Sequence, residues 1–186
     1  MKTLSSKAKW AISILMITAL IAGSYIFQPW KLFVDTVVQE RIPTSQQSPE
    51  SATGNSDTDA AQEEPENSEP ILLAQGSLIS HEHVTSGTVK ILQLPDGTRV
   101  LRLEDLDTSD GPKVEVWLTD APVLAGQDGW RVFDDGNYQS LGALKGNQGS
   151  QNYEIPADLD LSDFSSVSLW CVTFSVSFGA AELLTS

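Results

Sequence analysis

The hydrophobic pattern of the chain begins with a long uncharged run near the N-terminus. No charged residue occurs in Trp10–Trp30, and a helix of these 21 residues would be about 31 Å long, close to the roughly 30 Å hydrocarbon core of a bilayer. Three lysines and no acid precede the run, which places the N-terminus in the cytoplasm. We therefore predict a single-pass transmembrane helix, with its span at about residues 10–30, in an N-terminal membrane anchor of residues 1–38.

A cleaved signal peptide is the alternative interpretation of this run. The small residues Ala22-Gly23-Ser24 are of the kind that a signal peptidase accepts. Hydrophobic residues continue beyond that point, at Ile26-Phe27 and Leu32-Phe33, which favours an uncleaved signal-anchor. In both cases we expect the rest of the chain to be extracytoplasmic.

Polar and acidic residues dominate the next segment, residues 39–70. It is rich in Ser, Gln, Glu, Asp and Pro, and residues 35–70 carry nine acids and a single base. This composition offers too little apolar surface to offset the entropy of ordering, so we predict a disordered acidic linker. The linker would be a tether that holds the following domain away from the membrane.

From residue 71 to residue 186 the hydrophobic positions follow the two-residue period of β-strands. Two β-branched runs, Thr88–Leu94 and Thr98–Leu103, flank the turn sequence Pro95-Asp96-Gly97, which predicts a hairpin. Alternation predicts another strand at residues 114–119. Further strand candidates are residues 130–133, 152–155 and 167–178, and loops are expected at residues 134–137 and 146–149. Because no window has a 3.6-residue repeat, we predict an all-β domain, an antiparallel sandwich or barrel.

The last predicted strand carries the only cysteine. If residues 167–178 alternate strictly, one face is apolar throughout and must face the core. This face holds Trp170, Val172, Phe174, Val176 and Phe178. Cys171 then points the other way, into a small and partly shielded environment outside the main core.

Charge and cysteine content exclude several classes of protein. The chain has 11 Lys and Arg against 25 Asp and Glu, a net charge of −14, so it lacks the cations for a nucleic-acid partner. One cysteine cannot form an internal disulfide, a CxxC redox pair or a Cys-rich zinc site. Residues 71–186 have sixteen acids and six bases, and this negative field disfavours a reactive thiolate.

Several separated motifs, taken together, resemble a known family, the DM13 domain. They occur in the family's order over about residues 76–184. The motifs are His83–Gly87, Leu101–Glu104, Gly111-Pro112 with Val116 and Leu118, Leu141–Gly149, Tyr153–Pro156, and Ser166–Cys171 followed by Phe174, Val176, Phe178 and Ala180. One departure is Phe164, which stands where the family has a tyrosine.

The resemblance implies a role in electron transfer or oxidation at a cell surface. It points to Cys171 as the redox residue, either as a bare thiol or as the ligand of a prosthetic group such as haem, and to His83 as the family's histidine position. Cys171 and His83 are therefore the candidate residues for binding haem or another prosthetic group. We therefore expect an accessory redox module with a protein redox partner and no small-molecule substrate of its own. Two alternatives stay open: a non-catalytic β-sandwich that binds a protein or a surface glycan, with Cys171 structural, and an intermolecular disulfide through the odd cysteine.

Metal chemistry has weaker support. On a strand, His81 and His83 would share a face and could hold a metal with Cys171, but residues 71–186 contain no Met to serve as the axial ligand of a blue-copper site. The acids at 105–110 lack the spacing of a calcium loop, and the Gly-rich run at 142–149 lacks the phosphate-binding GxxxxGK[ST] sequence. We therefore expect no metal site.

Overall fold

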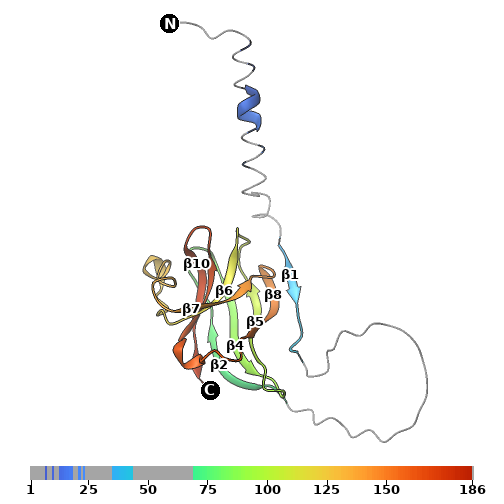
Figure 1. Ribbon diagram of the computed structural model, residues 1–186, viewed down its shortest axis with the longest axis vertical. Coiled ribbons are helices and arrows are strands. Elements are labelled where there is room, and N and C mark those ends of the chain that lie inside the picture. Colours follow the sequence, from blue (N-terminus) through green and yellow to red (C-terminus); the bar gives the residue numbers. More distant parts are fainter. Residues whose placement is uncertain are drawn as a thin grey trace, which may run out of the picture.

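A computed structural model describes residues 7, 10, 13–18, 21, 23, 35–43 and 69–185 (Figure 1). In these residues the strands form two sheets, which confirms the all-β prediction. The six-stranded sheet has the order β1 (Val37–Gln39), β8 (Gln148–Ile155), β5 (Arg99–Asp107), β4 (Ser86–Gln93), β2 (Ile71–Ser77) and β11 (Leu184–Thr185). The five-stranded sheet has the order β3 (Ile79–Ser80), β10 (Val176–Glu182), β9 (Ser166–Cys171), β6 (Val114–Thr119) and β7 (Tyr138–Ala143).

The predictions for the N-terminal anchor and the linker concern residues that mostly lie outside the described part of the chain. Much of the predicted span, including residues 24–30, lies outside the described residues, as do residues 44–68 of the predicted linker. Among the residues that the structure describes, no helix is long and apolar enough to cross a membrane.

The predicted β4–β5 hairpin is confirmed. The two strands pair antiparallel from Gln93 with Arg99 onward. Asp96 accepts a hydrogen bond from the Thr98 amide at 2.9 Å, and Gly97 has a φ of +85°, a conformation that glycine adopts without strain. The turn residues therefore fix the register that sends alternate side chains of both strands into the core.

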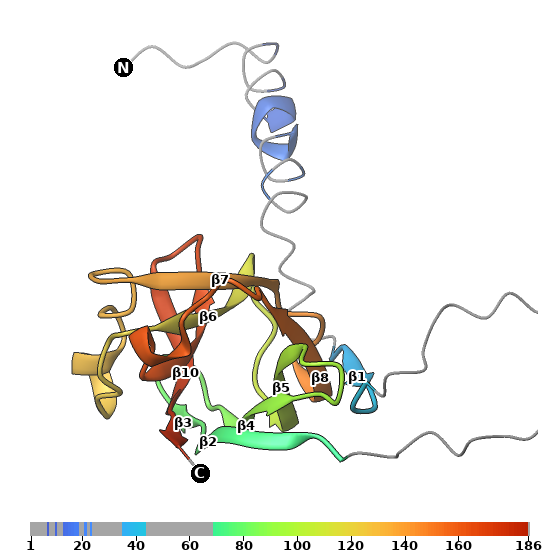
Figure 2. The same cartoon turned by 60° about the horizontal axis from the view of Figure 1, so that its bottom comes forward.

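The main core lies between the two sheets, which Figure 2 shows facing each other. It takes one face of each central strand, with Val89 and Leu101 from the larger sheet and Val116 and Leu169 from the smaller one, all 2% exposed or less. At about 25 cal/mol per Å² of apolar surface, this burial is the main driving force for folding. The alternation predicted for residues 114–119 is thus confirmed.

A second apolar cluster covers the outer face of the smaller sheet. It consists of Trp117, Ala121, Phe133, Trp170 and Ala180. The covering segment includes a 3-10 helix, η2 (Gly126–Gly129), and residues 130–133 follow it as turns, so the strand predicted there is wrong. Phe133 is fully buried as part of this cover.

The last predicted strand is also wrong. Residues 167–178 form two strands, β9 and β10, joined by a tight turn in which Ser175 has a φ of 49°. Phe174, predicted to be in the core, lies in that turn and is 50% exposed. Cys171 belongs to the main core, and Trp170 belongs to the second cluster. Both faces of β9 are buried, because the second cluster covers the outer face. The alternation of polar and apolar residues along β9 therefore does not show which face lies in the main core.

Five strands were not predicted: β1, β2, β3, β7 and β11. β1 crosses the boundary between the predicted anchor, residues 1–38, and the predicted linker, residues 39–70. It pairs with β8 in parallel, which makes the larger sheet mixed. β2 opens the predicted domain at Ile71, and β7 pairs with β6. The loop predicted at 146–149 is shorter than expected, since Gln148 and Gly149 already belong to β8.

Candidate functional site

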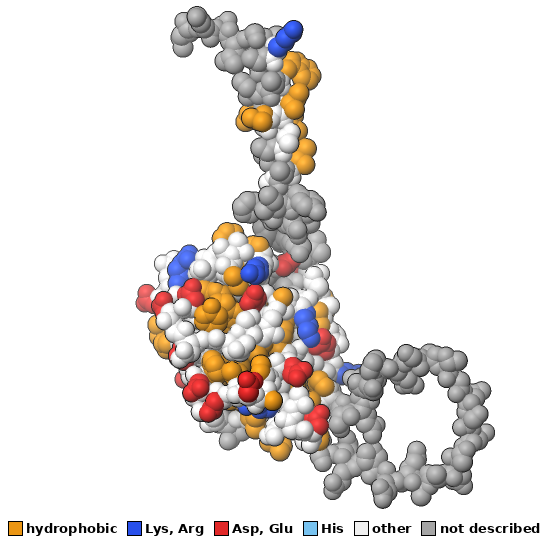
Figure 3. All heavy atoms as spheres, viewed as in Figure 1, with side chains coloured by type: hydrophobic (Ala, Val, Ile, Leu, Met, Phe, Trp, Pro, Cys, Tyr) orange, Lys and Arg blue, Asp and Glu red, His pale blue; other side chains and the backbone are white. Residues whose placement is uncertain are grey.

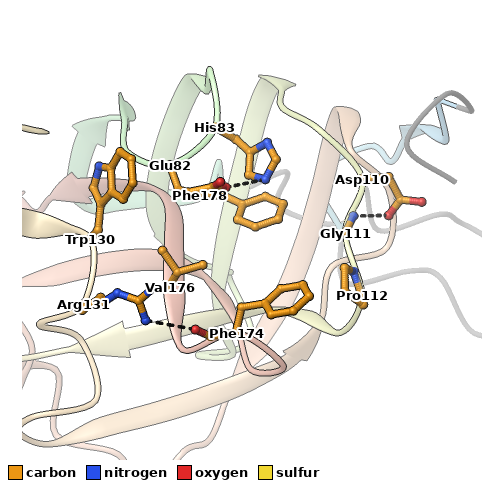
Figure 4. Close-up of a pocket in the computed structure, with 10 residues that line it drawn as sticks. All are labelled: Glu82, His83, Asp110, Gly111, Pro112, Trp130, Arg131, Phe174, Val176 and Phe178. Atoms are coloured by element: carbon orange, nitrogen blue, oxygen red, sulfur yellow. Dashed lines mark hydrogen bonds and ion pairs between the residues drawn. The ribbon is translucent and has the colours of Figure 1, made fainter. Parts of the chain in front are cut away.

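A pocket of approximately 360 Å³ opens at one end of the smaller sheet. Four loops and one strand meet there. Its lining residues are Glu82 and His83 after β3, Asp110, Gly111 and Pro112 before β6, Trp130 and Arg131 after η2, Phe174 in the β9–β10 turn, and Val176 and Phe178 on β10. Figure 4 shows Trp130 and Arg131 on one side of the pocket and Pro112 on the other.

Close packing of a glycine shapes one wall. A Cβ atom at Gly111 would lie 2.5 Å from Cζ of Phe178, which is closer than the two atoms can approach. The absence of a side chain lets the Gly111-Pro112 segment pass directly against the Phe178 ring. The sequence motif therefore has a local role, because it brings the β5–β6 connection up to β10.

Cys171 lies directly behind this wall. Its thiol donates a hydrogen bond to the carbonyl oxygen of Pro112, with Sγ and O 3.3 Å apart. Its cross-strand partners are Val114 on β6 and Val176 on β10, and its side chain has no exposed surface. Because Pro112 and Val176 also line the pocket, a single layer of residues separates the thiol from it.

His83 lies in the pocket itself. Its ring packs against Phe178, with the centroids 3.8 Å apart and the planes at 45°. Its Nε2 atom is 2.6 Å from Oε2 of Glu82, an ion pair when the imidazole is protonated. A quarter of the His83 side chain is exposed, so it can contact a molecule that enters the pocket.

His81 points elsewhere. Residues 81–83 form a bend and not a strand, so the two histidines do not share a face. His81 is buried, with Nε2 3.0 Å from the Leu124 carbonyl oxygen and Nδ1 2.9 Å from Oγ of Ser177. A carbonyl oxygen only accepts, so Nε2 carries a hydrogen. The Ser177 hydroxyl beside Nδ1 also lies 3.1 Å from the Gly179 carbonyl oxygen, to which it donates. Burial lowers the pKa of His81, although the bond to Leu124 partly offsets it.

The described residues contain no group of three or more His, Cys, Asp or Glu that could hold a metal ion. His81 is held on the side of the second cluster, where its ring stacks on Phe133 at 5.7 Å. The arrangement considered for copper, with both histidines beside Cys171, is therefore not formed.

Arg131 and Phe174 complete the pocket, and sequence reasoning missed both as site residues. Arg131 donates from Nη1 to the carbonyl oxygens of Phe174 at 3.2 Å and Ser175 at 3.1 Å, which ties η2's loop to the β9–β10 turn. Trp130, expected on a strand, also lines the pocket. These residues come from loops with no distinctive spacing, so the only local hint of a site is that an aromatic residue, Trp130, stands next to a cation, Arg131.

The comparison with protein families decides the identity. A family model described as "Electron transfer DM13" matches residues 77–183. The chain belongs to the DM13 family. Neither the curated proteins nor the solved structures contain a match. The DM13 match covers the pocket, His83 and Cys171, and it leaves out β1 and nearly all of β2.

The family resemblance implied a prosthetic group such as haem, and the DM13 domain can be tested for it. An axial ligand must direct its donor atom into a slot that holds the flat macrocycle. The Cys171 thiol is buried, points at a backbone carbonyl and does not line the pocket. A pocket of approximately 360 Å³ is also at the small end for a ligand site. The residues around Cys171 therefore do not fit a haem.

The charge of the DM13 domain also bears on the site. Residues 71–186 contain sixteen acids and six bases, which give this part of the chain a net charge of −10. In the face shown by Figure 3, acidic side chains are spread over the surface and Lys and Arg occur singly. A protein that docks on this face is attracted if its own surface is positive.

Proposed function

We propose that this chain is a membrane-tethered, extracytoplasmic electron-transfer module whose redox centre is the pocket backed by Cys171. The observation that carries the proposal is the hydrogen bond from Cys171 to Pro112, a residue of the pocket wall. Membership of a family described as electron transfer supports the redox role.

Burial limits how Cys171 can act. Thiol–disulfide exchange and an intermolecular disulfide both need a direct approach to sulfur, and the Cys171 side chain has no exposed surface. Electron transfer needs no bond to the thiol: an oxidised group of the partner protein in the pocket would be reduced by one electron, and Cys171 would become a thiyl radical and release its proton to solvent through the pocket. Cys171 also holds the only sulfur atom after residue 16, so an oxidisable sulfur in this domain must be this one.

His83 and the aromatic rings supply the contact surface for the partner's redox group. Phe174 is half exposed, and His83 and Phe178 face the same pocket. A planar aromatic or conjugated group stacks favourably on such rings. The negative charge of the domain favours a protein partner with a positive docking surface.

Protein-film voltammetry of the full-length chain in detergent micelles tests the redox role. We expect a redox signal in the wild type that disappears in Cys171→Ser, because serine keeps the hydrogen bond to Pro112 but has no oxidisable sulfur. Tyr138→Phe, on the far edge of the smaller sheet, is the control and should keep the signal. An unchanged signal in a folded Cys171→Ser variant would overturn the proposal, and a Soret band in the purified chain would overturn the exclusion of haem.

The membrane tether rests on the uncharged run at residues 10–30. Mass analysis of the mature protein from the membrane fraction tests it. The intact N-terminus should be present, whereas a loss of about 24 residues would identify a cleaved signal peptide.

A second candidate is a non-catalytic domain that binds a protein or surface glycan in the same pocket. The full burial of Cys171 in the main core favours it, since free cysteine commonly packs as a small hydrophobic residue. Voltammetry separates the two: the binding domain would show no signal that depends on Cys171.

A further inference from the structure

A short strand from outside the family match lies on the free edge of β8. β1 pairs with β8 in parallel, with Val38 opposite Gly149 (Figure 1). The Gln148 amide donates to the Thr36 carbonyl at 3.3 Å, and the Glu40 amide donates to the Ser150 carbonyl at 2.8 Å. Even-numbered residues of the segment thus face β8, and the alternation of a strand turns the amide of Gln39 away.

Side chains of the domain hold both ends of this segment. At its start, Asn147 accepts from the Thr36 amide at 2.7 Å and donates to Asp35 at 2.9 Å. At its end, the Glu40 carboxylate accepts from Lys145 at 2.8 and 3.0 Å and from the Asn152 amide at 2.7 Å. These contacts recognise an extended, acidic segment in one register.

Two further contacts reach the backbone of the segment. Arg102 donates to the Glu40 carbonyl at 3.0 Å, and the Asn152 side chain donates to the Arg41 carbonyl at 2.8 Å. Arg102 is itself buried and oriented by Glu104 at 2.9 Å. A buried, oriented arginine that binds a carbonyl outside the domain is a built part of a receptor surface.

Glycines in the domain make room for the segment. A Cβ at Gly146 would lie 2.4 Å from the Thr36 carbonyl oxygen, and a Cβ at Gly149 would lie 2.0 Å from that of Val38. Any side chain at either position would push the segment off the edge. The Gly146-Asn147-Gln148-Gly149 motif therefore receives residues 35–43 and is not only a loop.

We propose that residues 35–43 are a docking strand that clamps the DM13 domain to the N-terminal segment, so that the acidic residues 44–68 connect two strands of one sheet and do not space the domain from the anchor. The proposal replaces the tether expected from composition, because β1 and β2 are both strands of the larger sheet. It rests on the proposed membrane anchor only for what lies before residue 31.

The two arrangements differ in reach. With the strand docked, six residues separate Trp30 from Val37 and span at most about 25 Å. With the strand undocked, the 40 residues from 31 to 70 would lie between the anchor and β2. As a flexible coil they give a root-mean-square distance of about 35 Å and a far larger maximum.

The test compares two proline variants of the full-length chain in lipid vesicles. Glu40→Pro removes the hydrogen bond from the Glu40 amide to the Ser150 carbonyl, and it removes the carboxylate that binds Lys145. Gln39→Pro, one residue earlier, removes an amide that faces away from β8 and is the matched control. Hydrogen exchange of the segment reports docking, and energy transfer from a dye on Asp134→Cys to a lipid-headgroup acceptor reports the distance to the membrane.

We expect the Thr36 amide, which donates to Asn147, and the Gln148 amide, which donates to the Thr36 carbonyl, to exchange roughly tenfold or more slowly in the wild type than in an unstructured peptide. Both amides should lose this protection in Glu40→Pro. Energy transfer should fall in Glu40→Pro and stay at the wild-type level in Gln39→Pro. Absent protection in the wild type overturns the docking strand, and so does energy transfer unchanged by Glu40→Pro in a chain whose N-terminus is intact. Mass analysis that finds residues 1–24 missing would overturn the membrane anchor alone, since hydrogen exchange still measures docking.

Discussion

Cys171 and Pro112 are joined by a hydrogen bond from Sγ to the carbonyl oxygen, at 3.3 Å, that crosses from the end of β9 to the chain just before β6. The bond places the thiol on the inner side of the pocket wall and removes it from solvent. Because the thiolate must meet an attacking reagent directly, we predict that an aromatic disulfide reagent modifies Cys171 only when the domain unfolds. Reaction rates measured in increasing urea should follow the unfolded fraction.

Thr173→Cys is the control for this prediction. Thr173 is exposed, two residues beyond Cys171 in the β9–β10 turn. In this variant one thiol should react rapidly in native buffer and the second only in urea. A wild-type thiol that reacts as fast as the introduced one would show that the wall opens readily, and the pocket would then be an access route to sulfur.

Gly111→Ala tests the pocket wall itself. The new Cβ would lie 2.5 Å from the Phe178 ring, so the ring must shift and its contact with His83 must change. Overpacking of this kind costs about 1–3 kcal/mol in the free energy of unfolding, measured by urea denaturation. Gly111→Ala should cost less in a chain that already carries Phe178→Leu, because the smaller side chain leaves room for the new Cβ. A double-mutant cycle with no coupling between the two substitutions would contradict the direct contact.

Sequence reasoning predicted the hairpin at Pro95-Asp96-Gly97 but missed the β9–β10 turn, and the difference is physical. The first turn uses residues whose conformational preferences are known in advance. The second places Ser175 at a φ of 49° without glycine or proline, so nothing local marks it. Strict alternation then ran through the turn and assigned the apolar side of the strand to Trp170, when Cys171 faces the main core.

The site was predictable only in part. The resemblance to the DM13 family pointed to His83 and Cys171, and the structure places them on the two sides of one wall, with Pro112 and Phe178 between. Trp130 and Arg131 come from a loop after η2. Their position in the pocket depends on packing between residues far apart in the sequence, which no local pattern encodes. β1 was missed because three residues are too few to show a period.

His81 should make the domain less stable in mild acid. Its burial lowers its pKa from the ordinary value of 6.5, so the unfolded chain takes up a proton more readily than the folded one. The groups around the ring, Ser177, Leu124 and Phe133, carry no charge that would stabilise a protonated His81. We predict that the free energy of unfolding is constant above pH 6.5 and decreases below it, by at most about 1.4 kcal/mol per pH unit.

Urea denaturation at several pH values between 7.5 and 5 measures this effect. His81→Gln should lose the dependence, because an amide does not titrate in this range. His83→Gln is the control that should keep it, since His81 is unchanged. If His81→Gln retains the wild-type slope, another group is responsible for the pH dependence.

Glu40 should make docking of residues 35–43 sensitive to strong acid. Burial would raise the pKa of Glu40, but hydrogen bonds from Lys145 and the Asn152 amide, together with the Lys145 and Arg102 charges, outweigh it and hold the pKa below the ordinary 4.5. The other titratable neighbour, Tyr153, stays neutral, because burial raises its pKa to about 12. A carboxyl with a lowered pKa stabilises the docked state above its ordinary pKa, and that stabilisation disappears as the pH falls through the lowered value.

We therefore predict that docking is independent of pH from 7 to about 5 and weakens below pH 4.5. The energy-transfer assay in lipid vesicles follows docking, and near-ultraviolet circular dichroism shows that the domain is still folded at each pH. Glu40→Gln keeps the size of the side chain but cannot titrate, so its energy transfer should be weaker at pH 7 and should not respond to acid while the domain stays folded. A Glu40→Gln variant that responds to acid as the wild type does would mean that a different carboxyl controls the release of the strand.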